Sequence, residues 1–115
     1  MNLSQKFDII RSVSNSSYWS KRIFSELCCL AEVSKIHGGE FDSHIEAAAD
    51  ELVAAIRENQ TIPAPIAQKV EADLSGFSPA VKAYTVYCVS HAHIDMNWMW
   101  GYHETASVTV DTFRT

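Results

Sequence analysis

Residues 83–89 form an apolar run that limits the possible folds of this chain more than any other segment, and it leads directly into His91, His93 and Asp95. The run is rich in β-branched and aromatic residues and has apolar side chains on both faces, which is typical of a strand buried in a parallel sheet. From about Glu104 the apolar residues return to helical spacing. Strand, loop and helix in this order predict the opening of a βα unit, which requires a second strand beside the first.

The sequence before this run is helical in pattern. Apolar residues recur at three- and four-residue spacing from residue 18 to 37 and again from 66 to 76, and a further short helix is indicated within the first dozen residues. Between these segments a helix is predicted to begin at Ser43, whose hydroxyl can cap it while Glu46 reaches back. We therefore expect three or four helices in this part of the chain.

The 115 residues thus divide into an N-terminal helical region, residues 1–82, and a strand-loop-helix segment, residues 83–115. Hydrophobic residues make up 47% of the chain and charged residues 20%, the balance of a globular protein rather than a disordered one. The expected fold class is mostly α, plus one β-strand and a following helix that begin an α/β domain with a parallel sheet.

The net charge indicates which classes of partner are unfavourable, and the cysteine content indicates the cellular compartment. The net charge is −5, and the absence of a basic stripe argues against a nucleic-acid or anionic-membrane partner. No apolar run approaches the roughly 20 residues of a membrane-spanning helix. Three cysteines without a signal-peptide pattern indicate reduced thiols, so we expect a cytoplasmic protein.

The segment after the predicted strand has the spacing of a metal site. In extended backbone, residues i and i+2 project to the same side, roughly 6 to 7 Å apart along the chain. His93 and Asp95 can therefore grip one ion, and His91 is a further candidate, either as a third ligand or as a residue that supports the ligands. Two imidazoles and a carboxylate suit Zn²⁺. The remaining histidines are expected to be ordinary surface or core residues.

The ligand spacing alone leaves several families open. Hydrolases of the metallo-β-lactamase fold carry His-x-His-x-Asp-His, but Met96 occupies the place of the final histidine here. Amidohydrolase barrels carry His-x-His at the end of the first strand, without tryptophans after it. Trp98 follows the candidate ligands directly, and a flat indole suits the apolar face of a sugar ring. Trp100 and Tyr102 are expected to pack as core residues.

The sequence from His91 to Trp100, with Thr105 opening a helix, resembles glycoside hydrolase family 38, the α-mannosidases. The likeness covers about residues 84–115, and it implies that residues 83–115 are the truncated first strand-loop-helix of a catalytic domain. It implies the start of a seven-stranded β/α barrel, with His93 and Asp95 as the first two Zn²⁺ ligands and Trp98 lining the sugar subsite next to the metal. The implied substrate is a mannose-containing oligosaccharide or mannoside.

The resemblance also implies a retaining mechanism, in which a downstream aspartate binds the metal and attacks the anomeric carbon and a further histidine completes the coordination. After Asp95 the only acidic residues are Glu104 and Asp111, in the predicted helix, and neither is assigned the role of nucleophile. We expect no catalytic residue within the 115 residues, weak zinc binding and no activity of this segment alone.

Two other classes of function stay open from the sequence. One is a different metallohydrolase, amidohydrolase-like or metallo-β-lactamase-like, and the other is a non-catalytic helical interaction module over residues 17–76. A strand at 83–89 without a partner would leave N–H and C=O groups unpaired, which predicts a homo-oligomer formed through that strand.

Overall fold

The computed structural model of the chain describes residues 1–89, 94 and 99–114. By their internal contacts these residues form two units, Met1–Tyr84 and Thr85–Thr115, and each is described by itself. Regular structure in the described ranges is helical, in the order α1 (Leu3–Val13), α2 (Tyr18–Ile36), α3 (Asp42–Asn59), α4 (Ala64–Leu74), the 3₁₀ helix η1 (Ser75–Phe77), α5 (Ser78–Lys82) and α6 (Tyr102–Arg114).

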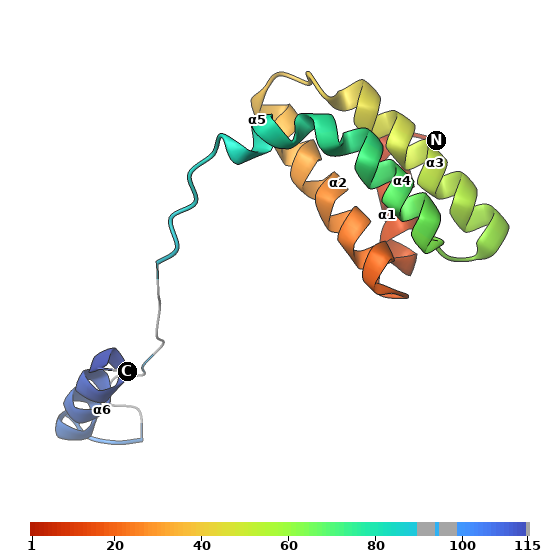
Figure 1. Cartoon of the computed structure of the whole chain (residues 1–115). Coiled ribbons are helices and arrows are strands. Elements are labelled where there is room, and N and C mark those ends of the chain that lie inside the picture. The colour runs from red at the N-terminus through yellow and green to blue at the C-terminus, as the bar shows by residue number, and fades with distance from the viewer. Residues whose placement is uncertain (90–93, 95–98, 115) are drawn as a thin grey trace. The chain divides into compact units, whose positions relative to one another are not determined.

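The first unit is a bundle built mainly from α1 to α4. The main packing pairs are α1 with α3 and α2 with α4, and α3 also contacts α2 and α4. Figure 1 shows α4 lying between α2 and α3. The helices predicted over residues 18–37 and 66–76 are confirmed as α2 and α4, and the helix in the first dozen residues as α1.

One continuous apolar core lies between these helices. Most of its side chains come from the helical stripes seen in the sequence, because residues three and four apart share one face of a helix, and Phe41 and Ile62 enter it from turns between helices. Removing these side chains from water is the main term that stabilises the bundle. The largest fully buried apolar residues are Ile10, Ile23, Leu27, Ile45, Leu52, Ile62 and Val70.

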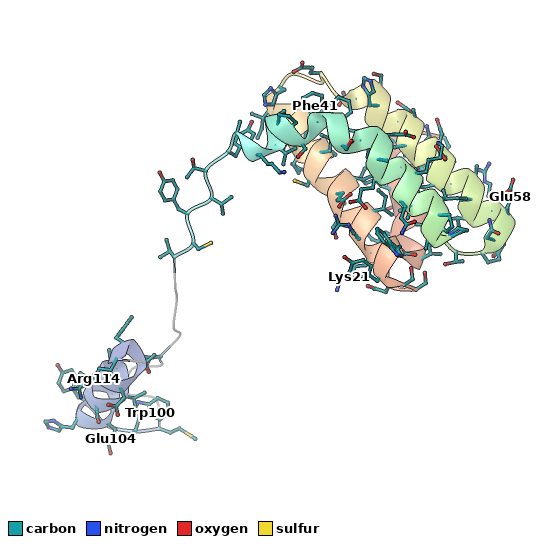
Figure 2. The ribbon with its side chains drawn as sticks, in the orientation of Figure 1. Lys21, Phe41, Glu58, Trp100, Glu104 and Arg114 are labelled. Carbon is teal, nitrogen blue, oxygen red and sulfur yellow. The ribbon has the colours of Figure 1, made fainter. Side chains whose placement is uncertain are left out.

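The turn between α2 and α3 is fixed by a buried hydroxyl. Ser34, which is fully buried, accepts a hydrogen bond from the backbone N–H of Phe41 at 3.0 Å and donates one to Asp42 Oδ1 at 2.7 Å. Gly38 and Gly39 have φ values of 68° and 87°, a region that side chains with a Cβ rarely adopt. Two glycines therefore let the chain reverse while Phe41 enters the core, near the end of the bundle where Figure 2 labels it.

The capping box predicted from Ser43 and Glu46 is wrong. α3 begins at Asp42, with Phe41 at the N-cap position and no side-chain cap. Glu46 instead binds Lys6 of α1, at 2.8 Å, and Asp50 binds the same ammonium at 2.7 Å. The carboxylate that would complete a local cap joins two helices.

The strand predicted at residues 83–89 is also wrong, and with it the α/β fold class. The described residues contain no strand, and residues 85–89 have no regular secondary structure. Val86, Tyr87 and Val89 are between 81% and 88% exposed. Their β propensity reflects how such side chains pack on neighbouring strands, and no described segment supplies a neighbour. The homo-oligomer predicted through this strand therefore loses the element on which it was based.

The helices in the described part of the chain differ from transmembrane helices. None of them combines the length and the apolar character that a transmembrane helix needs.

Candidate functional site

The residues that the sequence assigns to a metal and sugar site, His91, His93, Asp95 and Trp98, lie outside the described residues. The structure describes the chain on both sides of them, up to Val89 and again from Met99. The described residues that follow this segment in the sequence lead into α6, and the beginning of this helix is the part of the chain next to the candidate site.

The N-terminus of α6 is capped by a side chain from its own first turn. Gly101 is at the N-cap position, and its carbonyl oxygen accepts the first helical bond from Thr105 N–H at 3.2 Å. The backbone N–H of Gly101 donates to Glu104 Oε2 at 3.0 Å. This is the backward half of a capping box, in which the third helical residue satisfies the N–H of the N-cap residue.

Thr105 connects this cap to Trp100. The indole Nε1–H of Trp100 donates to Thr105 Oγ1 at 2.9 Å, and the same hydroxyl donates to the carbonyl oxygen of Gly101 at 3.3 Å. Thr105 is 6% exposed and is the one buried residue among those described in the second unit. In Figure 2, Trp100 and Glu104 lie near one end of α6 and Arg114 near the other.

The sequence-based expectations for the aromatic residues at the start of α6 were wrong. Trp100 and Tyr102 were expected to pack as core residues, but they are 37% and 64% exposed. The pairing of Trp100 with Thr105 was missed. A tryptophan directly before a glycine N-cap, with threonine four residues after the glycine, is the sequence signal that could have indicated it.

The two acidic residues of α6 lie in different surroundings. The Glu104 carboxylate is held by the N–H of Gly101, and Asp111 is exposed on the helix.

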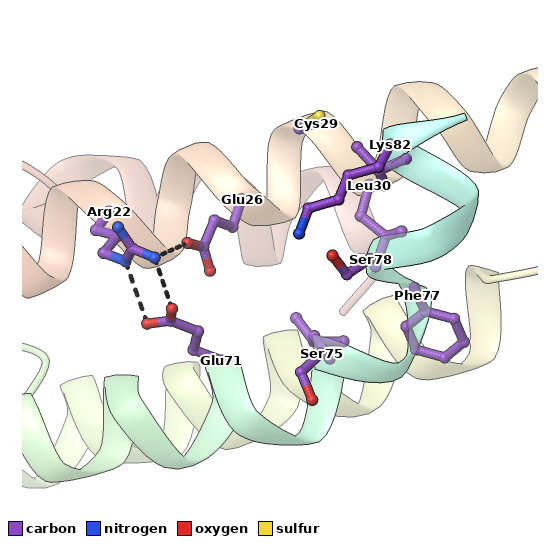
Figure 3. A pocket seen from close by; sticks show the side chains of 11 residues that line it. Arg22, Glu26, Cys29, Leu30, Glu71, Ser75, Phe77, Ser78 and Lys82 are labelled. Atoms are coloured by element: carbon purple, nitrogen blue, oxygen red, sulfur yellow. Dashed lines mark hydrogen bonds and ion pairs between the residues drawn. The ribbon is translucent and has the colours of Figure 1, made fainter. Parts of the chain in front are cut away.

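A second feature that could hold a ligand is a groove of about 450 Å³ in the first unit, between α2, α4, η1 and α5 (Figure 3). Its apolar lining includes Leu30, Leu74, Phe77 and Val81. It contains none of the residues that the sequence assigns to a site.

Arg22 at one end of this groove binds two carboxylates. It donates to Glu71 through Nη2 at 2.6 Å and Nε at 3.2 Å, and Nη2 lies 3.1 Å from Glu26 Oε1. Hydrogen bonding to Arg22 lowers the pKa of Glu71 below its ordinary value. Burial, and then the nearby charge of Glu71, raise the pKa of Glu26 although Arg22 opposes this. The arrangement ties α2 to α4.

Among the described residues, no three His, Cys, Asp or Glu side chains lie together in a way that could hold a metal ion. His37 is held by the hydroxyl of Tyr84, 3.0 Å from its Nε2, and its ring lies beside Phe41. His44 stacks edge-on against Phe77. His103 is exposed on α6.

Comparison of the chain with models of protein families, with curated proteins and with solved structures gives no match in any of the three.

Proposed function

We propose that this chain is the N-terminal segment of a zinc-dependent, retaining α-mannosidase that hydrolyses terminal α-mannosides, and that the 115 residues alone are inactive. The observation that carries the proposal is the sequence His93-Ile94-Asp95 followed by Trp98, immediately before α6. The proposal rests on the residue types and on their resemblance to family 38, and it makes no use of a strand.

The donor set fits the proposed metal. Zn²⁺ binds imidazole nitrogen and carboxylate oxygen at about 2.0 to 2.2 Å, and His93 and Asp95 supply one of each. His91 is a third candidate ligand or a residue that orients the others. When bound, the metal would hold hydroxyls of a terminal mannose, and the role of His93 and Asp95 is to fix its position. Trp98 would place its ring against the apolar face of the sugar.

The same donor set explains the expected inactivity. Two or three protein ligands leave the rest of the coordination sphere to water, so zinc is held weakly. A retaining glycosidase needs two carboxyl groups about 5 to 5.5 Å apart at the scissile bond. Glu104 bonds to the helix cap and Asp111 lies on the exposed surface of α6, and neither is assigned a place in this pair.

Release of an aryl group from an aryl α-mannoside tests this proposal. The 115-residue chain should show no turnover with or without added Zn²⁺. The chain extended by its downstream coding sequence should hydrolyse the mannoside in a zinc-dependent reaction that His93→Ala abolishes. Robust turnover by the 115 residues, or an extended chain indifferent to His93→Ala, would contradict the proposal.

The proposed compartment is the cytoplasm. Cys28, Cys29 and Cys88 are free thiols, and unpaired cysteines are common in reducing compartments. The proposed ligand is a mannoside, with no nucleic-acid or membrane partner.

One observation favours a second candidate, a non-catalytic helical interaction module. The first unit has its own core and an open groove, so it can act without the second unit. If binding to a partner is the function, replacing His93 and Asp95 will leave that binding unchanged. Loss of partner binding in the same variant would exclude this alternative.

A further inference from the structure

We propose that the groove between α2, α4, η1 and α5 binds a small amphiphile, a monocarboxylate with an elongated apolar body (Figure 3). The carboxylate is bound by Lys82 of α5, and the apolar body lies along the groove toward Arg22 of α2. All the residues that line the groove belong to the first unit. The inference therefore goes beyond the proposed function and is independent of the proposed zinc ligands.

The groove has the size and the lining of a small-ligand site. Its volume of about 450 Å³ lies within the range of roughly 300 to 1,000 Å³ of such sites, which are mostly apolar with a few polar groups. Arg22 and Leu30 both line it and lie on α2 roughly 12 Å apart along the helix axis. A medium-length alkyl chain fits this span. The apolar part of the lining includes Leu30, Leu74, Phe77 and Val81.

Lys82 supplies a cation at the α5 end of the groove. Within the described part of the chain its ammonium has no ion pair and no hydrogen bond, whereas Lys6 and Lys69 are each held by carboxylates. Ser78 lies one turn before Lys82 in α5, so the two side chains share one face of that helix, and Figure 3 shows both at the groove. An ammonium and a nearby hydroxyl can both donate to one carboxylate.

The opposite end of the groove favours a ligand with a single carboxylate. Arg22 is bound by Glu71 at two points, and its Nη2 lies 3.1 Å from Glu26, so two carboxylates already face one guanidinium. A second carboxylate on the ligand would meet these anions, and like charges repel. The charges of the groove therefore match a molecule with its anion at Lys82 and an uncharged tail.

Octanoate is the probe, and its binding to the full 115-residue chain is measured by calorimetric titration. Octanol and octylamine have the same tail without the anion, and octanedioate has an anion at both ends. Octanoate should bind more tightly than each of these three compounds. Equal binding of octanol or octylamine would show that the apolar lining alone is recognised, and it would overturn the proposal.

Lys82→Met keeps an apolar stem and removes the charge. It should weaken octanoate binding roughly fivefold, the scale of a partly exposed ion pair, and remove the preference for octanoate over octanol. Lys21→Met is the matched control, because Lys21 is an exposed lysine of α2 that does not line the groove. Its octanoate affinity should equal that of the wild type. Equal losses in the two variants would mean that net charge governs binding and would overturn the proposal.

Cys29 gives a readout that is confined to the groove. Its thiol is exposed and lines the groove, whereas Cys88 is an exposed thiol of the second unit. Octanoate should slow the alkylation of Cys29 by iodoacetamide, followed by mass spectrometry, and leave the rate at Cys88 unchanged. Protection of both thiols would indicate adsorption to any apolar surface, and protection of neither would place the octanoate elsewhere. Either result would overturn the proposal.

The same measurement tests a second copy of the chain as the occupant of the groove. In that case the protection of Cys29 would rise with protein concentration in the absence of octanoate. The proposal predicts an alkylation rate at Cys29 that does not depend on protein concentration, and a dependence would overturn it.

Discussion

Arg22 of α2 and Glu71 of α4 form a two-point ion pair, with Nη2 2.6 Å from Oε1 and Nε 3.2 Å from Oε2. Glu26 approaches the same guanidinium at 3.1 Å from within α2. The pKa values of the two carboxyls shift in opposite directions. Hydrogen bonding to Arg22 stabilises Glu71 as an anion and lowers its pKa, whereas burial of Glu26 outweighs its attraction to Arg22 and raises its pKa.

Glu71→Gln should therefore lower the melting temperature at pH 7 by about 3 °C, the scale of a partly exposed ion pair in a domain of this size. Since the pKa of Glu71 is lowered by folding, its contribution is present above pH 4.5 and is lost as the pH falls through the lowered value. Wild type and variant should converge in strong acid. A constant difference across the titration would contradict the assignment.

Glu26→Gln is the matched comparison. Because the pKa of Glu26 is raised by folding, the folded state favours its protonated form, and stability is lost as the pH rises through the raised value. At pH 7 the neutral glutamine should leave the melting temperature unchanged or raise it. A decrease as large as that of Glu71→Gln would show that the ion pair with Arg22 outweighs burial.

Leu52→Ala should lower the free energy of unfolding by about 3 kcal/mol, because it removes a fully buried side chain of α3 and leaves a cavity in the apolar core of the first unit. Val108→Ala, at a half-exposed position of α6, should have little effect. Urea denaturation followed by circular dichroism at 222 nm measures both. Equal losses in the two variants would mean that the second unit shares the cooperative core.

The exposed apolar side chains of residues 85–89 should make the full chain self-associate by hydrophobic contact, which does not require a strand. Val86, Tyr87 and Val89 are between 81% and 88% exposed, and apolar side chains exposed close together in the sequence favour association. Sedimentation velocity should show larger species for residues 1–115, and a monomer both for residues 1–84 and for the Val86→Lys/Val89→Lys variant. Ile36→Lys, which alters an exposed residue of the bundle, should not change the association. A monomeric full chain at all concentrations would refute this prediction.

The sequence predicts most of the bundle because the helices of the first unit carry regular apolar stripes. It does not predict the hydrogen bonds and ion pairs between distant residues that determine where these helices begin. α3 starts before Ser43 because Ser34 holds the turn, and Glu46 is unavailable for a local cap because it binds Lys6, 40 residues away. Such partners depend on how the helices pack, and the spacing of residues within one helix does not indicate them.

The strand error has a different cause. Residues 83–89 have the composition of a strand, but strand stability comes from hydrogen bonds and side-chain pairs with a neighbouring strand. Composition measures only the readiness of a segment to join a sheet. A helix supplies its own hydrogen bonds, which is why the same reasoning succeeded for α2 and α4.

For the candidate site, sequence supplies the identity and spacing of His93, Asp95 and Trp98, and those remain predictions because the residues lie outside the described part of the chain. The contact that sequence reasoning missed, between Trp100 and Thr105, depends on a rotamer and a helix start. Periodicity specifies neither of these.

Calorimetric titration of Zn²⁺ into the 115-residue chain tests the metal site most directly. The account predicts weak binding that is lost in His93→Ala and in Asp95→Ala and is unchanged in His103→Ala, which alters an exposed histidine of α6. Zinc binding that survives the loss of both His93 and Asp95, or no zinc binding by the wild-type chain, would contradict it.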